Sequence, residues 1–167
     1  MESEGATIQR IADHLRDYVF SDDVTVTWVL RAHLAIESSI DDMLHEFVPS
    51  ASRLTKGNRF SFSQKLEMCM ALELLNDRMY TILKSVNTLR NSCAHNLLEA
   101  IVYDDLQPLS SALGREACKE ALESTVSKVI PFEHSGDLQR YLCYLLSSCV
   151  AQMSSWVVLY KNSQNKK

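Results

Sequence analysis

Three residues near the end of one apolar-striped segment have side chains that could cleave a phosphodiester bond in RNA. Arg90, Asn91 and His95 lie in the stretch Arg90-Asn91-Ser92-Cys93-Ala94-His95. On a helix, Asn91 and His95 are i, i+4 neighbours that share a face, and the long side chain of Arg90 can reach round to it. These three side chains could therefore converge on one phosphate.

The chemistry of RNA cleavage suits these residue types. An RNA strand carries its own nucleophile, the 2′-hydroxyl, beside the scissile phosphate. Cleavage then needs a group that moves a proton, which His can do near neutral pH. It also needs a fixed cation at the phosphoryl oxygens, which Arg supplies, and Asn adds a neutral hydrogen-bond donor. No metal or other cofactor is required by this set of residues.

A helix must position these side chains. Apolar residues recur at helical spacing from Met79 to Ala94, which predicts a helix from about 78 to 95 with Arg90 and His95 on its last turns. The same spacing and capping signals predict further helices near 4–20, 24–48, 63–75, 112–129 and along the apolar stripe from Leu138 to Tyr160. We expect connections at 49–62 and 96–109, and frayed ends at about 1–4 and 162–167.

The composition favours one all-α domain. The chain has 167 residues, of which 46% are apolar, and only four Gly and three Pro, which is few for a fold of many strands and tight turns. No internal repeat is visible. We therefore predict a single domain over residues 1–167, built as an up-and-down helical bundle of five or six helices.

The cysteines and the start of the chain predict a cytoplasmic protein. The chain has five cysteines, an odd number, and no Cys-x-x-Cys pair. This pattern argues against a disulfide framework or a zinc knuckle. The acidic start Met1-Glu2-Ser3-Glu4 lacks the order of a secretory signal. No uninterrupted apolar run approaches the roughly 18 residues of a membrane span, so we expect no membrane partner.

A basic segment offers a second feature that could contact RNA. Residues 49–66 contain no acidic residue, and Phe60 and Phe62 lie among their basic residues. Those basic residues are Arg53, Lys56, Arg59 and Lys65. Such a segment can hold a single strand by phosphate contacts and stacking. The alternative is a solvated loop whose two Phe anchor it to the core. The net charge of −4 argues against a protein that tracks long nucleic acid, but leaves room for a local basic site.

Four polar residues form a ridge on the second predicted helix. They are spaced by four and are His33, Glu37, Asp41 and His45. Such a ridge could bind a metal, but a carboxylate-bridged site needs matching ligands such as a Glu-x-x-His pair on another helix, and the sequence has none. A solvated or dimer-facing stripe is the more common outcome. His33 or Glu37 could instead face the Arg90 site.

The stretch Leu89–Asn96 resembles the R-x4-6-H signature of the HEPN superfamily, including the polar residue after the Arg. The run Phe62–Leu89 and the pair Asp104-Asp105 resemble its mannitol operon repressor (MltR-like) branch. The resemblance covers roughly residues 24–110, and the long C-terminal helix agrees with it. It implies a helical bundle that usually forms a homodimer, with two signature motifs facing each other.

The resemblance implies that the two motifs form one composite active site. Catalytic members are metal-independent endoribonucleases and often serve as toxins or antiphage effectors. The resemblance implies that Arg90 holds the phosphate, that Asn91 supports Arg90 in this role, and that His95 transfers the proton or binds the transition state. Many toxin members that are paired with a nucleotidyltransferase antitoxin have Tyr two residues after the His. Here that position is Leu97, so an antitoxin of that kind is not implied, while another antitoxin or regulatory partner remains open.

The MltR-like branch is regarded as regulatory, which gives an alternative: a regulatory or partner-binding module without catalysis. Arg90 could then pair with an acidic neighbour, and His95 could stabilise the helix C-terminus, where a cation is favoured. Direct DNA repression is the weakest interpretation, because no helix-turn-helix with a basic recognition helix is apparent.

Overall fold

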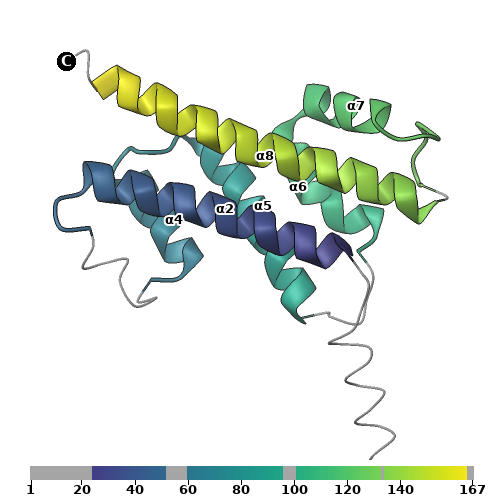
Figure 1. The fold of residues 1–167 in the computed structure, drawn as a ribbon, viewed down its shortest axis with the longest axis horizontal. Helices are drawn as coiled ribbons and strands as arrows, with labels where there is room; N and C mark the ends of the chain where they lie inside the picture. The colour runs from purple at the N-terminus through teal and green to yellow at the C-terminus, as the bar shows by residue number, and fades with distance from the viewer. Residues whose placement is uncertain (1–23, 52–59, 96–100, 133, 165–167) are drawn as a thin grey trace, which may run out of the picture.

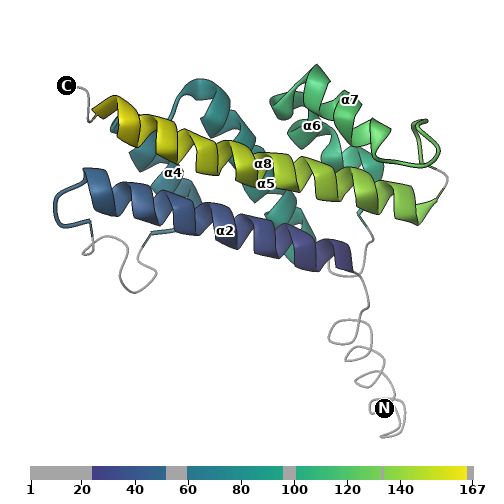
Figure 2. The same cartoon turned by 45° about the horizontal axis from the view of Figure 1, so that its top comes forward.

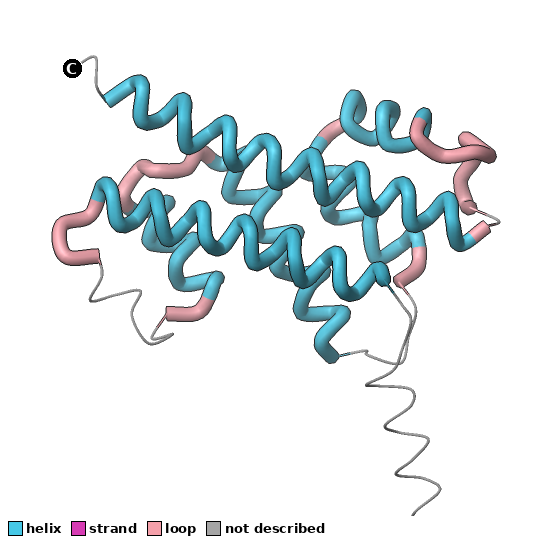
Figure 3. The backbone as a smooth tube through the Cα atoms, viewed as in Figure 1, coloured by secondary structure: helices cyan, strands magenta, loops and turns pink. Residues whose placement is uncertain are grey.

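A computed structural model describes residues 24–51, 60–95, 101–132 and 134–164 of the chain, and every regular element in these ranges is helical (Figures 1 and 3). The elements are α2 (Val24–Phe47), α4 (Phe62–Ala71), α5 (Asp77–His95), the 3-10 helix η1 (Tyr103–Leu106), α6 (Gln107–Leu113), α7 (Arg115–Glu123) and α8 (Ser135–Gln164). The prediction of an all-α helical bundle is confirmed. The helix predicted near 4–20 lies outside the described residues.

The two long helices, α2 and α8, lie side by side across the molecule, and α5 packs against the pair (Figures 1 and 2). Each buries one apolar stripe at helical spacing, as amphipathic core helices do. The fully buried side chains at this junction include Val29, Ile36 and Ile40 of α2, Ile82, Leu83 and Val86 of α5, and Leu142, Leu145 and Cys149 of α8. This shared core fixes the position of α5, and with it the position of Arg90.

By length and composition alone, α8 could also cross a membrane. Among the described residues it is the one helix that passes this test, over Ser135–Ser163. In the fold, the apolar side chains of Leu142, Leu145 and Met153 are buried, while Ser147 and Ser154 on its other face are exposed. Two apolar side chains near the end of α8, Val158 and Leu159, are exposed, and 28% of its apolar window is buried.

Local capping signals account for where α4 and α5 begin. Ser61 caps α4: the Gln64 backbone N–H donates to Ser61 Oγ at 3.3 Å, and the Ser61 backbone N–H donates to Gln64 Oε1 at 2.8 Å. This reciprocal pair is a capping box. At α5, the Met79 backbone N–H donates to Asn76 Oδ1 at 2.8 Å, so Asn76 caps the start of this helix.

The predicted single helix over 112–129 is wrong. The structure has two helices there, α6 and α7, joined at Gly114. α6 also begins at 107, inside the predicted connection 96–109, with Pro108 in its first turn. Pro is tolerated in that turn because its missing N–H would have no partner in any case. The apolar periodicity runs on through Gly114, so it did not reveal the break.

Gly114 permits this break because of its backbone conformation. Its φ is +92° and its ψ is 172°, a region of dihedral space that is essentially restricted to glycine. A Cβ atom added there would meet no atom within 4 Å, so the cost of a side chain would come from the backbone alone.

We therefore expect Gly114→Ala to lower the free energy of unfolding by about 1–3 kcal/mol, measured by urea denaturation. Gly136→Ala is the matched control, since Gly136 lies in the first turn of α8 and a Cβ there also meets nothing within 4 Å. That control should leave stability unchanged or raise it, because Ala favours a helix over Gly. Equal stability of Gly114→Ala and the natural chain would contradict the assignment.

Candidate functional site

A cleft of about 630 Å³ between α2, α4 and α5 brings Arg90 and Asn91 together with the polar ridge of α2. Its polar lining includes His33, Glu37 and Asp41 from α2, Ser61, Ser63 and Lys65 from α4 and its cap, and Asn87, Arg90 and Asn91 from α5. Phe60 and Phe62 add aromatic walls. The size is within the range of about 300–1,000 Å³ that is common for small-molecule sites.

Arg90 and Asn91 are half-buried and contact each other in this cleft. An Arg90 guanidinium N–H (Nη1) donates to Asn91 Oδ1 at 3.1 Å. This bond uses one of the five N–H donors of Arg90 and leaves the amide NH₂ of Asn91 with both of its own. Within the described ranges, Arg90 forms no ion pair with a carboxylate. The pair can therefore offer several donors to an anion.

His95 is the last residue of α5, one helical turn beyond Asn91. The position of its imidazole lies outside the described part of the structure. The backbone thus supports the predicted i, i+4 relation between Asn91 and His95, and the contacts of the His95 ring stay a prediction.

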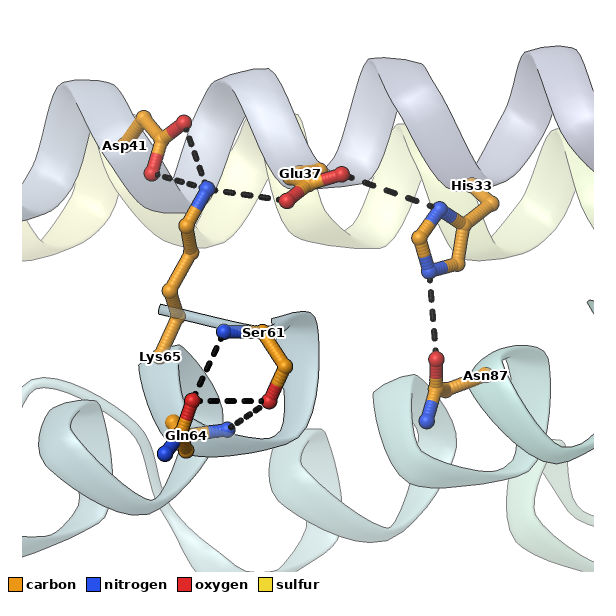
Figure 4. Close-up of polar contacts among 7 residues, drawn as sticks. All are labelled: His33, Glu37, Asp41, Ser61, Gln64, Lys65 and Asn87. Carbon is orange, nitrogen blue, oxygen red and sulfur yellow. Dashed lines mark hydrogen bonds and ion pairs between the residues drawn. The ribbon is translucent and has the colours of Figure 1, made fainter. Parts of the chain in front are cut away.

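Lys65 lies in a buried ion pair with two carboxylates of α2 (Figure 4). Its Nζ is 2.8 Å from Glu37 Oε1 and 2.8 and 2.9 Å from Asp41 Oδ1 and Oδ2. The residue is 4% exposed. Burial alone lowers the pKa of Lys65, but the hydrogen bonds to Asp41 and Glu37 outweigh it, so that the pKa is raised and the ammonium stays charged.

This geometry changes the role that the sequence predicted for Lys65. Its charge is compensated by two acids, so it does not belong to an exposed basic segment that contacts RNA. Phe62 is also buried, with its ring centroid 4.3 Å from that of His33, as the alternative of an anchored loop predicted. Arg53, Lys56 and Arg59 lie outside the described residues, and their predicted RNA contacts stay predictions.

The cluster around Lys65 shows what two residues of the polar ridge of α2, Glu37 and Asp41, contact. No group of three or more metal-ligating side chains exists within the described ranges. Between Glu37 and Asp41, where a metal ion would have to lie, the structure places the Lys65 ammonium. His33 and Glu37 do line the cleft of Arg90, which was one of the possibilities that the sequence left open.

His33 joins α2 to α5 through Asn87 (Figure 4). The His33 Nε2 atom is 3.2 Å from Asn87 Oδ1, and Asn87 Nδ2 donates to Ser63 Oγ at 3.1 Å. Because the Asn87 carbonyl faces the ring, Nε2 carries the proton and donates. His33 Nδ1 is 3.9 Å from Glu37 Oε2, which is too far for a hydrogen bond.

Burial lowers the pKa of His33 below its usual value near 6.5, and the nearby charges of Arg90 and Lys65 lower it further. The bond to Asn87 and the charge of Glu37 oppose this shift without cancelling it. His33 is therefore a neutral imidazole at pH 7.

The sequence did not single out Asn87, although it precedes Asn91 by four and therefore shares its helix face. That spacing could have indicated that Asn87 belongs to the site. No comparable spacing links Lys65 to its acidic partners, because they lie 24 and 28 residues away in the chain.

Removal of Lys65 should destabilise the fold more than removal of an exposed lysine. Lys65→Met leaves two carboxylates, 26% and 27% exposed, without their cation. We expect a loss of about 2–3 kcal/mol, below the roughly 3–5 kcal/mol of a fully buried broken pair, in urea denaturation. Lys119→Met, which removes an exposed ion pair at 3.9 Å to Glu123, should cost less than about 1 kcal/mol. Equal losses in the two variants would contradict this role.

The lowered pKa of His33 predicts a pH dependence of stability. Since the unfolded chain binds the proton more readily than the fold, stability should decrease as pH falls below about 6.5, by up to about 1.4 kcal/mol per pH unit. His33→Gln should lack this component of the slope, measured by urea denaturation between pH 7 and pH 5. His134→Gln, at an exposed position, is the control and should retain it. An unchanged slope in His33→Gln would contradict the assignment.

Comparison of the chain with protein-family models, with curated proteins and with solved structures gives no match.

Proposed function

We propose that the cleft is the RNA-cleaving site of a metal-independent endoribonuclease of HEPN type. The observation that carries the proposal is the Arg90–Asn91 pair, which is hydrogen-bonded, half-buried and free of carboxylate partners within the described residues, in a cleft of about 630 Å³. Arg90 binds the scissile phosphate, Asn91 orients it, and His95 transfers the proton.

The proposed reaction balances with the RNA alone. The 2′-oxygen forms a bond to phosphorus as the P–O5′ bond breaks, and the proton lost by the 2′-hydroxyl is balanced by the proton gained by the 5′-oxygen. The products are a 2′,3′-cyclic phosphate and a 5′-hydroxyl. Charge builds up on the phosphoryl oxygens in the transition state, and a half-buried guanidinium stabilises that charge more than a fully solvated one would.

The charge balance of the cleft supports binding of an anion at Arg90. Without Lys65, the carboxylates of Glu37 and Asp41 would make the cleft net negative and repel a phosphate. With Lys65 held between them, and with neutral His33, the acids keep one uncompensated negative charge, which Arg90 balances, so that the cleft is neutral instead of negative. The guanidinium of Arg90 has no carboxylate partner within the described residues and can bind a phosphate directly.

The proposal includes a homodimer, as the resemblance to the HEPN superfamily implies, in which a second copy of the motif completes the site. It also includes a toxin or antiphage setting in the cytoplasm, where an antitoxin or another regulatory protein restrains the activity. Growth after inducible expression in a bacterial host, with His95→Ala beside the natural chain at equal protein levels, tests this setting. Growth arrest that His95→Ala relieves is the expected result.

RNA cleavage in excess chelator tests the enzyme itself. The purified chain should cleave single-stranded RNA with chelator present, and Arg90→Ala and His95→Ala should each lower the rate by about 10²- to 10⁴-fold. Arg78→Ala is the matched control, because Arg78 is an exposed arginine on the same helix, away from the cleft. Activity that neither variant lowers would contradict the proposal.

A second candidate is a non-catalytic, MltR-like regulatory or partner-binding module. It is favoured by a separate apolar groove of about 420 Å³ between α2 and α8, which is lined by Trp28, Leu146 and Val150. Apolar grooves of this kind often mark protein contacts. This candidate predicts no cleavage by the natural chain and tolerance of Arg90→Ala.

A further inference from the structure

The cleft has two chemically different ends. Asn87 contacts His33, and Arg90 follows Asn87 by three residues, so the arginine lies at the His33 end. Glu37 and Asp41 follow His33 along α2 at intervals of four residues, about 6 Å each, and Figure 4 shows the three side chains in a row facing α4 and α5. A cation therefore marks one end of the cleft and two carboxylates mark the other.

Glu37 keeps acceptor capacity although it holds Lys65. Its Oε2 atom lies 3.9 Å from His33 Nδ1 and so makes no hydrogen bond with it. Asp41 Oδ1 is buried beside Lys65 Nζ, at 2.8 Å, so Asp41 helps to hold the lysine and is not open to a ligand. A carboxylate has about four acceptor sites. This end of the cleft is therefore suited to a neutral group with N–H donors and unsuited to a phosphate.

An aromatic surface lies in the same cleft. Phe60 lines it and is half-buried, so part of its side chain remains accessible. Ser61, the next residue, is held in the capping box of α4, which fixes where Phe60 leaves the helix. An accessible aromatic side chain beside a cation can stack a base of a single strand.

We infer that the cleft holds one nucleotide of single-stranded RNA, with its phosphate at Arg90, its base against Phe60 and its exocyclic amino group donating to Glu37. Cytosine, adenine and guanine present such an amino group, and carboxylates accept from the amino group of cytosine in base recognition. Uracil presents a single N3–H between two carbonyl oxygens, which the carboxylates repel. The inference rests on the proposed function and adds the base preference of the same site.

Binding of RNA that cannot be cleaved tests this preference apart from catalysis. The probes are fluorescently labelled 2′-O-methyl hexamers of C, A and U, which lack the nucleophilic hydroxyl, titrated with the full chain at one fixed salt concentration. Fluorescence anisotropy should give a Kd for the C and A hexamers that is about 5- to 100-fold lower than for U. Arg90→Ala should weaken binding of all three.

Two sets of variants separate recognition from charge and from folding. Glu37→Gln should bring the ratio of the Kd values for U and C closer to one. Asp42→Asn makes the same charge change at an exposed neighbouring position outside the cleft and should keep the ratio. Phe60→Leu touches none of the ion pairs of Lys65 and should weaken binding of every hexamer. Thermal unfolding followed by circular dichroism checks that each variant folds.

Equal affinity for the three hexamers, no binding of any of them, or a preference that survives Glu37→Gln would overturn the inference. The proposed function fails separately. A base preference that depends on Glu37 without any cleavage would support the inference and contradict the enzyme. Cleavage that depends on Arg90, without a base preference in binding, would support the proposed function and overturn the inference.

Discussion

The ion pair of Lys65 with Glu37 and Asp41 is the interaction on which the candidate site depends. It joins α4 to α2 across the cleft and places a cation where two neighbouring carboxylates would otherwise repel each other. Burying the ammonium of Lys65 is costly, and it is tolerated only when opposite charges compensate it at close range. The short distances from Lys65 Nζ to both acids meet that condition.

The second link across the cleft is neutral. His33 donates to Asn87, and Asn87 donates to Ser63, so one amide connects α2, α5 and the start of α4. Because burial and the neighbouring cations keep His33 unprotonated, this link adds no charge beside Arg90. The walls of the cleft are thus tied together by polar contacts, while the guanidinium of Arg90 contacts only the amide of Asn91 among its described hydrogen-bond partners.

The apolar core holds these contacts in register. On one face of α5, the side chains of Ile82, Leu83 and Val86 are buried in the core. On another face, Asn87, Arg90 and Asn91 line the cleft. A helix that is anchored in this way presents neighbouring polar side chains in a fixed order. The apolar groove between α2 and α8 shares no lining residue with the cleft.

The sequence by itself determined the all-α class, the extents of α2 and α5, and the placement of Arg90 and Asn91 on one helix, because each depends on spacing within one segment. The tertiary structure decided three further features. Lys65 is neutralised by acids 24 and 28 residues away, His33 meets Asn87 across 54 residues, and one predicted helix is two helices joined at Gly114. The first two depend on how helices pack against each other, and the third on one backbone dihedral that leaves the apolar periodicity unchanged.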